Sequence, residues 1–74
     1  MFKSVTFEVI GDQRINCAAC EQRVTRLLKA VEGVGQVRAH AETQLIDVLF
    51  DARLVEARII ADRLSEAGYA TKVA

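Results

Sequence analysis

The sequence predicts an α+β fold in which four strands form one antiparallel sheet and two helices cover one of its faces. Segments with apolar residues at every second position alternate with segments that have apolar residues at helical spacing, in the order βαββαβ. A glycine follows each helical segment, at Gly33 and at Gly68, so the chain divides into two βαβ halves of similar design. Because such crossovers are nearly always right-handed, we expect the halves to interleave into the arrangement called ferredoxin-like.

The first half consists of a strand, a loop and a helix. Lys3–Ile10 alternates apolar with polar residues, which predicts a strand with one buried face. The polar segment Gly11–Asn16 has no periodicity and predicts a loop. Ala18–Val31 has the apolar spacing of a helix that ends before Gly33, a residue suited to the left-handed position after a helix.

The second half begins with a predicted β-hairpin. Val34–Ala41 alternates and is followed, after a short polar turn, by the strand Leu45–Phe50. His40 falls on the outward side of its strand, and we interpret it as a solvated residue rather than a metal ligand. Leu49 is expected to be an exposed apolar residue, which alone has no functional meaning.

A second helix and a last strand complete the chain. Leu54–Ala67 has helical spacing and ends at Gly68, and Tyr69–Val73 predicts the last strand. The apolar stripe of this helix is made of Ala57, Ile60, Ala61 and Leu64. We expect the open face of the sheet to carry Thr6, Glu8 and Asp47.

Composition limits the kinds of protein that this chain can be. With 74 residues and 51% hydrophobic content, residues 1–74 are expected to form one domain with a modest core. Ten basic residues balance ten acidic ones, which argues against a nucleic-acid partner. No apolar run approaches the ~20 residues that span a bilayer, and the amino terminus lacks the apolar segment of a signal peptide. We therefore expect no membrane insertion, and a cytoplasmic protein or a soluble domain excised from a longer one.

Both cysteines, Cys17 and Cys20, lie where the predicted loop enters the first helix. Two thiols at this spacing can bind one soft metal ion or close on each other as a disulfide. Cys20 begins the apolar stripe of the helix and Cys17 precedes the helix, so Cys17 is expected to be the more exposed thiol. The free N–H groups and the dipole of the helix N-terminus favour the thiolate form, which binds metals and attacks disulfides.

Three functions are possible for the two cysteines, namely metal binding, redox chemistry and a structural bridge, and the residues alone do not select one. In a reducing cytosol, two cysteines indicate metal or redox chemistry more often than a structural bridge. A closed structural zinc site needs four ligands, which two cysteines cannot supply. Glu21 is interpreted as a favourable charge in the first helical turn.

Four segments of the chain resemble those of a known family, and together they extend over nearly its whole length. They are Cys17-Ala18-Ala19-Cys20, Val31-Glu32-Gly33-Val34, Val48-Leu49-Phe50-Asp51 and Ala67-Gly68-Tyr69. The family is the heavy-metal-associated domain of copper chaperones, P-type metal ATPases and mercury-resistance proteins. A bare C-x-x-C motif is weak support, but this motif in a βαββαβ order is specific.

The resemblance implies a metal carrier that is not an enzyme. In such a protein Cys17 and Cys20 bind one soft ion, most commonly Cu(I), and pass it to an acceptor such as a metal-transporting P-type ATPase. A dimer bridged by the metal is a further partner arrangement. The alternatives are a resistance module that binds zinc, cadmium or mercury, and a small thiol–disulfide oxidoreductase. Similarity to thioredoxin would call for a proline facing the disulfide, and this chain has no proline.

The loop before the cysteines departs from the family pattern. Ile15 stands where relatives usually have Met, and Arg14 where they usually have Gly; the glycine is displaced to Gly11, so the loop is about three residues longer. Zinc-exporting relatives often carry Asp before the first cysteine, and the neutral Asn16 cannot act as a carboxylate ligand. The match at Tyr69 favours copper, because the equivalent tyrosine of many bacterial copper relatives lies beside the metal loop. We expect Ile15 to anchor the loop by inserting into the core.

Overall fold

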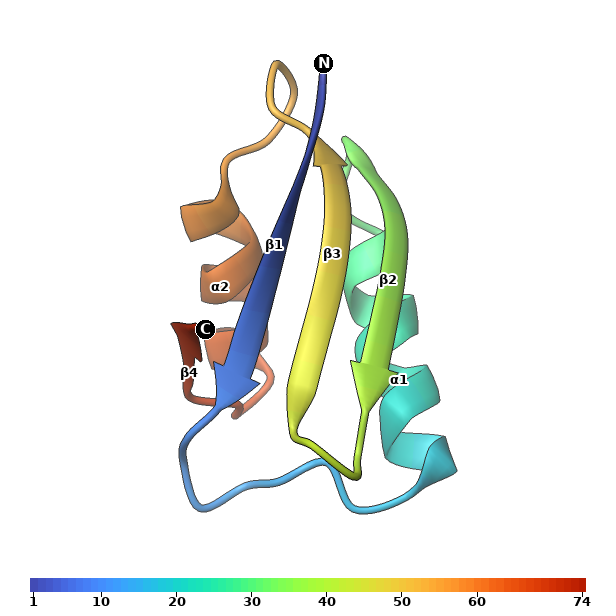
Figure 1. The fold of residues 1–74 in the computed structure, drawn as a ribbon, viewed down its shortest axis with the longest axis vertical. Helices are drawn as coiled ribbons and strands as arrows, with labels where there is room; N and C mark the ends of the chain where they lie inside the picture. Colours follow the sequence, from blue (N-terminus) through green and yellow to red (C-terminus); the bar gives the residue numbers. More distant parts are fainter.

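The computed structural model describes residues 1–74 and has one four-stranded antiparallel sheet with both helices against one face (Figure 1). The elements in chain order are β1 (Phe2–Val9), α1 (Ala18–Lys29), β2 (Val34–His40), β3 (Leu45–Asp51), α2 (Ala57–Glu66) and β4 (Thr71–Val73). The strand order is β2-β3-β1-β4, so β1 and β3 are central and β2 and β4 are edge strands. The structure confirms the predicted α+β, ferredoxin-like fold class.

The hydrophobic core lies between the sheet and the two helices. Strands form where β-branched and aromatic residues alternate with polar ones, and most of their apolar side chains face the helices. Leu49 is exposed, as predicted. Each helix contributes the stripe that its sequence predicts, with Val24 and Leu28 buried on α1 and Ile60 and Leu64 buried on α2. The other buried core residues are Phe7, Val9, Ile15, Val37, Ile46, Val48, Phe50, Val55 and Tyr69.

The register of the strands keeps these apolar residues on one face. Val5 pairs with Val48 and Phe7 with Ile46 across β1 and β3. The register shifts between Val34 and Gln36, at an irregularity in β2. A slip of one residue would turn every core side chain to solvent, so the burial pattern fixes this pairing.

A glycine in the left-handed conformation follows each helix, as predicted. Gly33 has φ +96° and Gly68 has φ +100°, in the left-handed region that other residues rarely adopt. Each glycine therefore turns the chain from a helix toward the next strand.

Three boundaries differ from the prediction by two or more residues. The helix α1 ends at Lys29 rather than Val31, because the Val31 N–H donates to the Leu28 carbonyl (3.0 Å), three residues back rather than four. The helix α2 begins at Ala57 rather than near Leu54, because Leu54 and Val55 donate their N–H groups to the Asp51 carbonyl (2.9 and 3.1 Å) and form a turn. The strand β4 begins at Thr71 rather than Tyr69. Tyr69 instead donates its N–H to the Leu64 carbonyl (2.9 Å) at the end of α2.

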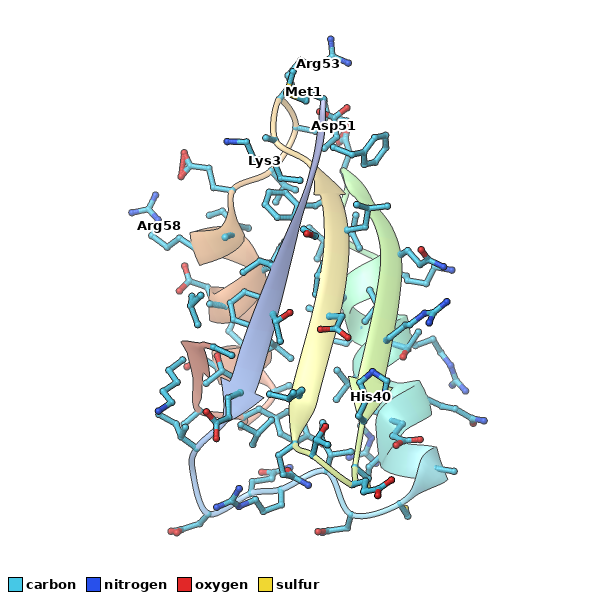
Figure 2. The ribbon with its side chains drawn as sticks, in the orientation of Figure 1. Met1, Lys3, His40, Asp51, Arg53 and Arg58 are labelled. Atoms are coloured by element: carbon cyan, nitrogen blue, oxygen red, sulfur yellow. The ribbon has the colours of Figure 1, made fainter.

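Asp51 organises the end of the molecule that carries Met1 and Arg53 (Figure 2). Its carboxylate accepts the Arg53 backbone N–H (3.0 Å) and is approached by the Arg53 guanidinium (3.4 Å) and the Met1 amino group (3.2 Å). These donors, the Arg53 backbone first, lower the pKa of Asp51 from 3.8 to about 2.

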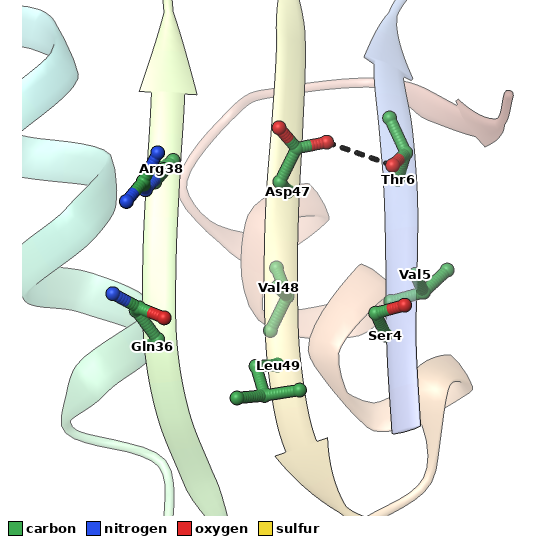
Figure 3. A pocket seen from close by; sticks show the side chains of 8 residues that line it. All are labelled: Ser4, Val5, Thr6, Gln36, Arg38, Asp47, Val48 and Leu49. Atoms are coloured by element: carbon green, nitrogen blue, oxygen red, sulfur yellow. Dashed lines mark hydrogen bonds between the residues drawn. The ribbon is translucent and has the colours of Figure 1, made fainter. Parts of the chain in front are cut away.

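The open face of the sheet is polar, as the sequence predicts. A shallow hollow of about 300 Å³ lies across β1, β2 and β3 (Figure 3). Within it the Thr6 hydroxyl donates to Asp47 Oδ1 (2.7 Å). His40, which does not line the hollow, has its Nε2 atom 3.3 Å from the other oxygen of Asp47. His40 is exposed, in agreement with its predicted place at the surface. Neither helix of the fold is long and apolar enough to cross a bilayer.

Candidate metal site

The two cysteines lie together at the N-terminus of α1. Cys17 is the residue before the first helical turn and has an extended backbone (φ −160°, ψ 176°), and Cys20 lies in that turn. Both are free thiols; the Cys17 thiol donates to the Cys20 sulfur, and their Sγ atoms are 3.6 Å apart. Cys17 is exposed, whereas Cys20 is partly buried and packs against the core, as their positions in the sequence predicted.

The helix N-terminus favours a charged sulfur at Cys20. No side chain caps this end of α1, so its N–H groups remain available to an anion. A hydrogen bond from the backbone at Asn16 is the largest cause that lowers the pKa of Cys20 below its ordinary value of 9.0, followed by the hydrogen bond with Cys17. The positive charge of Arg23 acts in the same direction.

The arrangement offers two ligands and no more. No group of three or more His, Cys, Asp or Glu side chains in the structure could hold a metal ion. Neither cysteine lines any of the five surface hollows; Cys17 is exposed at the surface and Cys20 is partly buried.

The separation of the sulfurs suits binding of one ion. Because a metal–thiolate bond is about 2.3 Å long, sulfurs 3.6 Å apart can reach the same ion without moving. A linear S–metal–S arrangement needs them about 1 Å further apart, at twice that bond length. Cys17 lies at the end of a loop and its thiol is exposed, so we expect Cys17 rather than Cys20 to move when the sulfurs separate.

The loop before the cysteines is held by Ile15 and by the turn between β2 and β3. The Ile15 side chain is 1% exposed, which confirms the prediction that it inserts into the core. The Ile15 N–H donates to Gln44 Oε1 (3.0 Å), and Gln44 Nε2 donates back to the Ile15 carbonyl (2.7 Å). The loop also contacts the segment before β4, where the Ile10 N–H donates to the Ala70 carbonyl (2.8 Å).

Two residues near the site have contacts that the sequence did not reveal. Glu21 lies in the first turn, as predicted, but its carboxylate also accepts the Ala41 N–H at 2.6 Å. Gln44 contacts the loop from a turn that is far away in sequence. The sequence predicts only a polar turn at residues 42–44, and that pattern does not indicate which residues the Gln44 side chain contacts. Tyr69 is 2% exposed and belongs to the hydrophobic core.

Comparisons with known proteins identify the family. The chain matches the model of the heavy-metal-associated domain over residues 13–70. A comparison with proteins of curated function finds no match. Oxidized MerP from Ralstonia metallidurans CH34 is 30% identical, with a TM-score of 0.86 over 99% of this chain and 97% of that one.

Two further solved structures have the same architecture. A copper binding domain from HMA7, a P-type ATPase, is 28% identical, with a TM-score of 0.85 over 96% of this chain and 92% of that one. The CopZ metallochaperone shares the fold, with 21% identity and a TM-score of 0.84 over 95% of this chain and 100% of that one. Since the family model covers well over half of the sequence, the chain belongs to the heavy-metal-associated domain family, a metal-binding domain that is not itself an enzyme.

Proposed function

We propose that this protein binds a single thiophilic ion through Cys17 and Cys20 and transfers it to a partner protein. The ion that we propose is Cu(I). The observation that carries this proposal is the pair of free thiols, 3.6 Å apart at an exposed helix N-terminus, with no third ligand nearby. The acceptor that we propose is a metal-transporting P-type ATPase, and the similarity to a copper binding domain of such an enzyme supports this choice. A reducing compartment such as the cytoplasm keeps both thiols free.

The number of ligands favours Cu(I) or Hg²⁺ over Zn²⁺. Thiolates are soft ligands that select soft ions, and two of them satisfy an ion that accepts two-coordination. Zinc in proteins is almost always four-coordinate and would require two more ligands. A metal-bridged dimer could provide these from a second chain, so a zinc, cadmium or mercury module is the alternative function.

The open site also suits transfer. An incoming thiolate can begin ligand exchange only at a sulfur that it can reach, and Cys17 is the exposed one. We propose that the partner's cysteine contacts the ion on the Cys17 side first. Cys20, partly buried at the helix edge, releases the ion last.

Competition titrations of the reduced protein test the choice of metal. Cu(I) and Zn²⁺ are each titrated against a chelator of known affinity, with Hg²⁺ and Cd²⁺ as further ions. We expect one Cu(I) per chain, retained against a chelator that removes Zn²⁺ completely. Retention of Zn²⁺ or Cd²⁺ but not Cu(I) would support the alternative module.

A disulfide-reduction assay separates a carrier from an oxidoreductase. An oxidoreductase needs a disulfide poised for exchange with its substrates, whereas a carrier does not. We expect the reduced protein to reduce a standard disulfide substrate no faster than an equal concentration of a simple dithiol. Faster turnover, together with no Cu(I) retention, would replace the carrier by a redox protein.

A further inference from the structure

We propose that the turn between β2 and β3, residues 41–44, is a brace that sets the separation of the two cysteine sulfurs. Its positioning residues are Gln44 and Glu21. This inference rests on the proposed function of Cys17 and Cys20 as a ligand pair, and its test needs no metal.

Gln44 holds the Cys17 side of the motif. Its side-chain amide accepts the Ile15 N–H (3.0 Å) and donates to the Ile15 carbonyl (2.7 Å), so it pairs with both backbone groups of that residue as a neighbouring strand would. The same Nε2 donates to the Ala41 carbonyl at 2.7 Å, which fixes the amide against its own turn. Ile15 is buried and lies just before Asn16 and Cys17, so this contact fixes the point from which Cys17 departs.

Glu21 holds the Cys20 side. It directly follows Cys20, and its Oε2 accepts the Ala41 N–H at 2.6 Å. Its own N–H donates to the Cys17 carbonyl at 3.0 Å. The segment Ile15–Glu21, which contains both sulfurs, is therefore attached at each end to the same turn, and Figure 1 shows the loop passing beside that turn.

The turn is itself attached to two strands by backbone hydrogen bonds of Gln44. Gln44 has φ +61°, a left-handed conformation that costs a residue with a side chain more than it costs glycine. Its N–H donates to the His40 carbonyl (2.9 Å) and its carbonyl accepts the Val9 N–H (2.9 Å), so the backbone is bonded to β2 and to the end of β1. Glycine would relieve the backbone but could make none of the three amide contacts. These three contacts explain why position 44 is a glutamine although its backbone is left-handed.

The test is the equilibrium between the protein thiols and glutathione. The reduced protein reacts with one oxidised glutathione to give the Cys17–Cys20 disulfide and two reduced glutathiones. The equilibrium constant is an effective concentration of one thiol near the other, so it reports their relative placement. We expect Gln44→Ala and Glu21→Ala each to lower this constant by about threefold to tenfold, since small losses of alignment have large effects on intramolecular reactions.

Matched variants separate the brace from other effects. Glu21→Gln keeps an acceptor for the Ala41 N–H but removes the charge, and Thr43→Ala alters an exposed neighbour that makes no side-chain hydrogen bond. Both are expected to stay within about twofold of the wild-type constant. Gln44→Gly relieves the left-handed backbone and is expected to show the same fall as Gln44→Ala, because it lacks the same contacts.

The brace is refuted if Gln44→Ala, Gln44→Gly and Glu21→Ala all keep the wild-type constant. It is equally refuted if Thr43→Ala and Glu21→Gln lower the constant as much as the alanine variants do. Absence of Cu(I) binding by the wild-type protein would refute the proposed function alone, because the glutathione equilibrium still measures the brace.

Discussion

At the scale of single residues, the cysteine loop depends on one buried side chain in an otherwise polar segment. Ile15 is 1% exposed although its neighbours Arg14 and Asn16 are exposed. An apolar side chain in this position ties the loop to the core, where it packs with the strands and helices. Ile15 therefore couples the stability of the domain to the placement of the two cysteines.

Ile15→Asp is expected to destabilise the domain by about 2–4 kcal/mol, because it removes a buried apolar group and introduces a carboxyl group into the core. The matched control is Ile10→Asp in the same loop, since Ile10 is 49% exposed. The control is expected to change the free energy of unfolding by less than about 0.5 kcal/mol. Equilibrium denaturation measures both; equal losses from the two variants would show that the burial of Ile15 does not matter.

Residue-scale features divide into those that the sequence could predict and those that it could not. The exposure of Cys17 follows from its place before the apolar stripe of the helix, and it is confirmed. The burial of Ile15 was expected because it is a lone apolar residue in a polar loop, where relatives usually have Met, and it is also confirmed. The contacts of Gln44 and Glu21 are made between residues far apart in sequence. They depend on the tertiary position of the turn, and no local pattern carries that information.

At the scale of elements, the two helices end where left-handed glycines permit a sharp turn. The glycine after α1 is the more constrained, because a Cβ at Gly33 would lie 2.8 Å from Leu54 Cβ and 3.0 Å from Val55 Cγ1. At Gly68 the corresponding contact is 2.6 Å to the end of the flexible Gln13 side chain, which can move. The glycines were sufficient to predict the turn after each helix, but the end of α1 was predicted two residues too late. The start of α2 depends on the turn around Asp51 and was predicted too early.

Gly33→Ala is expected to destabilise the fold by about 1–3 kcal/mol, from the left-handed backbone and the contact with Leu54. Gly35→Ala is the matched control: its φ is not left-handed, and the nearest atom belongs to the exposed ring of Phe2. Its effect on the free energy of unfolding is expected to stay below about 1 kcal/mol. A Gly33→Ala variant as stable as Gly35→Ala would exclude backbone strain as the reason for this glycine.

At the scale of the whole molecule, the cysteine pair and the Asp51 cluster are separate features with different sensitivities. The thiols stand at the end of the sheet where β1 leads into the long loop, and Asp51 ends β3 beside Met1 and Arg53 (Figures 1 and 2). The alternation and helical spacing of the sequence, together with the rule of right-handed crossovers, were sufficient to predict the chain order of the elements and their layering. They could not predict the cluster at Asp51, which is assembled by a tight turn and the start of the chain.

Acid is expected to weaken the fold through Asp51. Its folded-state pKa of about 2 lies below its ordinary value of 3.8, so the stability from its ionised form is fully present above pH 3.8 and is lost as the pH falls toward 2. Asp51→Asn should therefore reduce the loss of unfolding free energy between pH 4 and about 2. The control is Asp62→Asn, which alters an exposed carboxylate without hydrogen-bond partners. Urea denaturation at both pH values checks this, and an unchanged loss in Asp51→Asn would contradict it.

The claim that both sulfurs bind the ion is tested most directly by chelator competition for Cu(I) with the wild type, Cys17→Ser and Cys20→Ser. Ala19→Ser is the matched control, because it adds a hydroxyl between the cysteines and keeps both thiols. The two-thiolate site predicts one Cu(I) per wild-type or control chain. Each cysteine variant is expected to keep its fold and lose more than about 100-fold in affinity, beyond the 10–100-fold cost typical of losing an outer-shell partner. Tight binding of one Cu(I) by either folded cysteine variant would contradict the two-thiolate site.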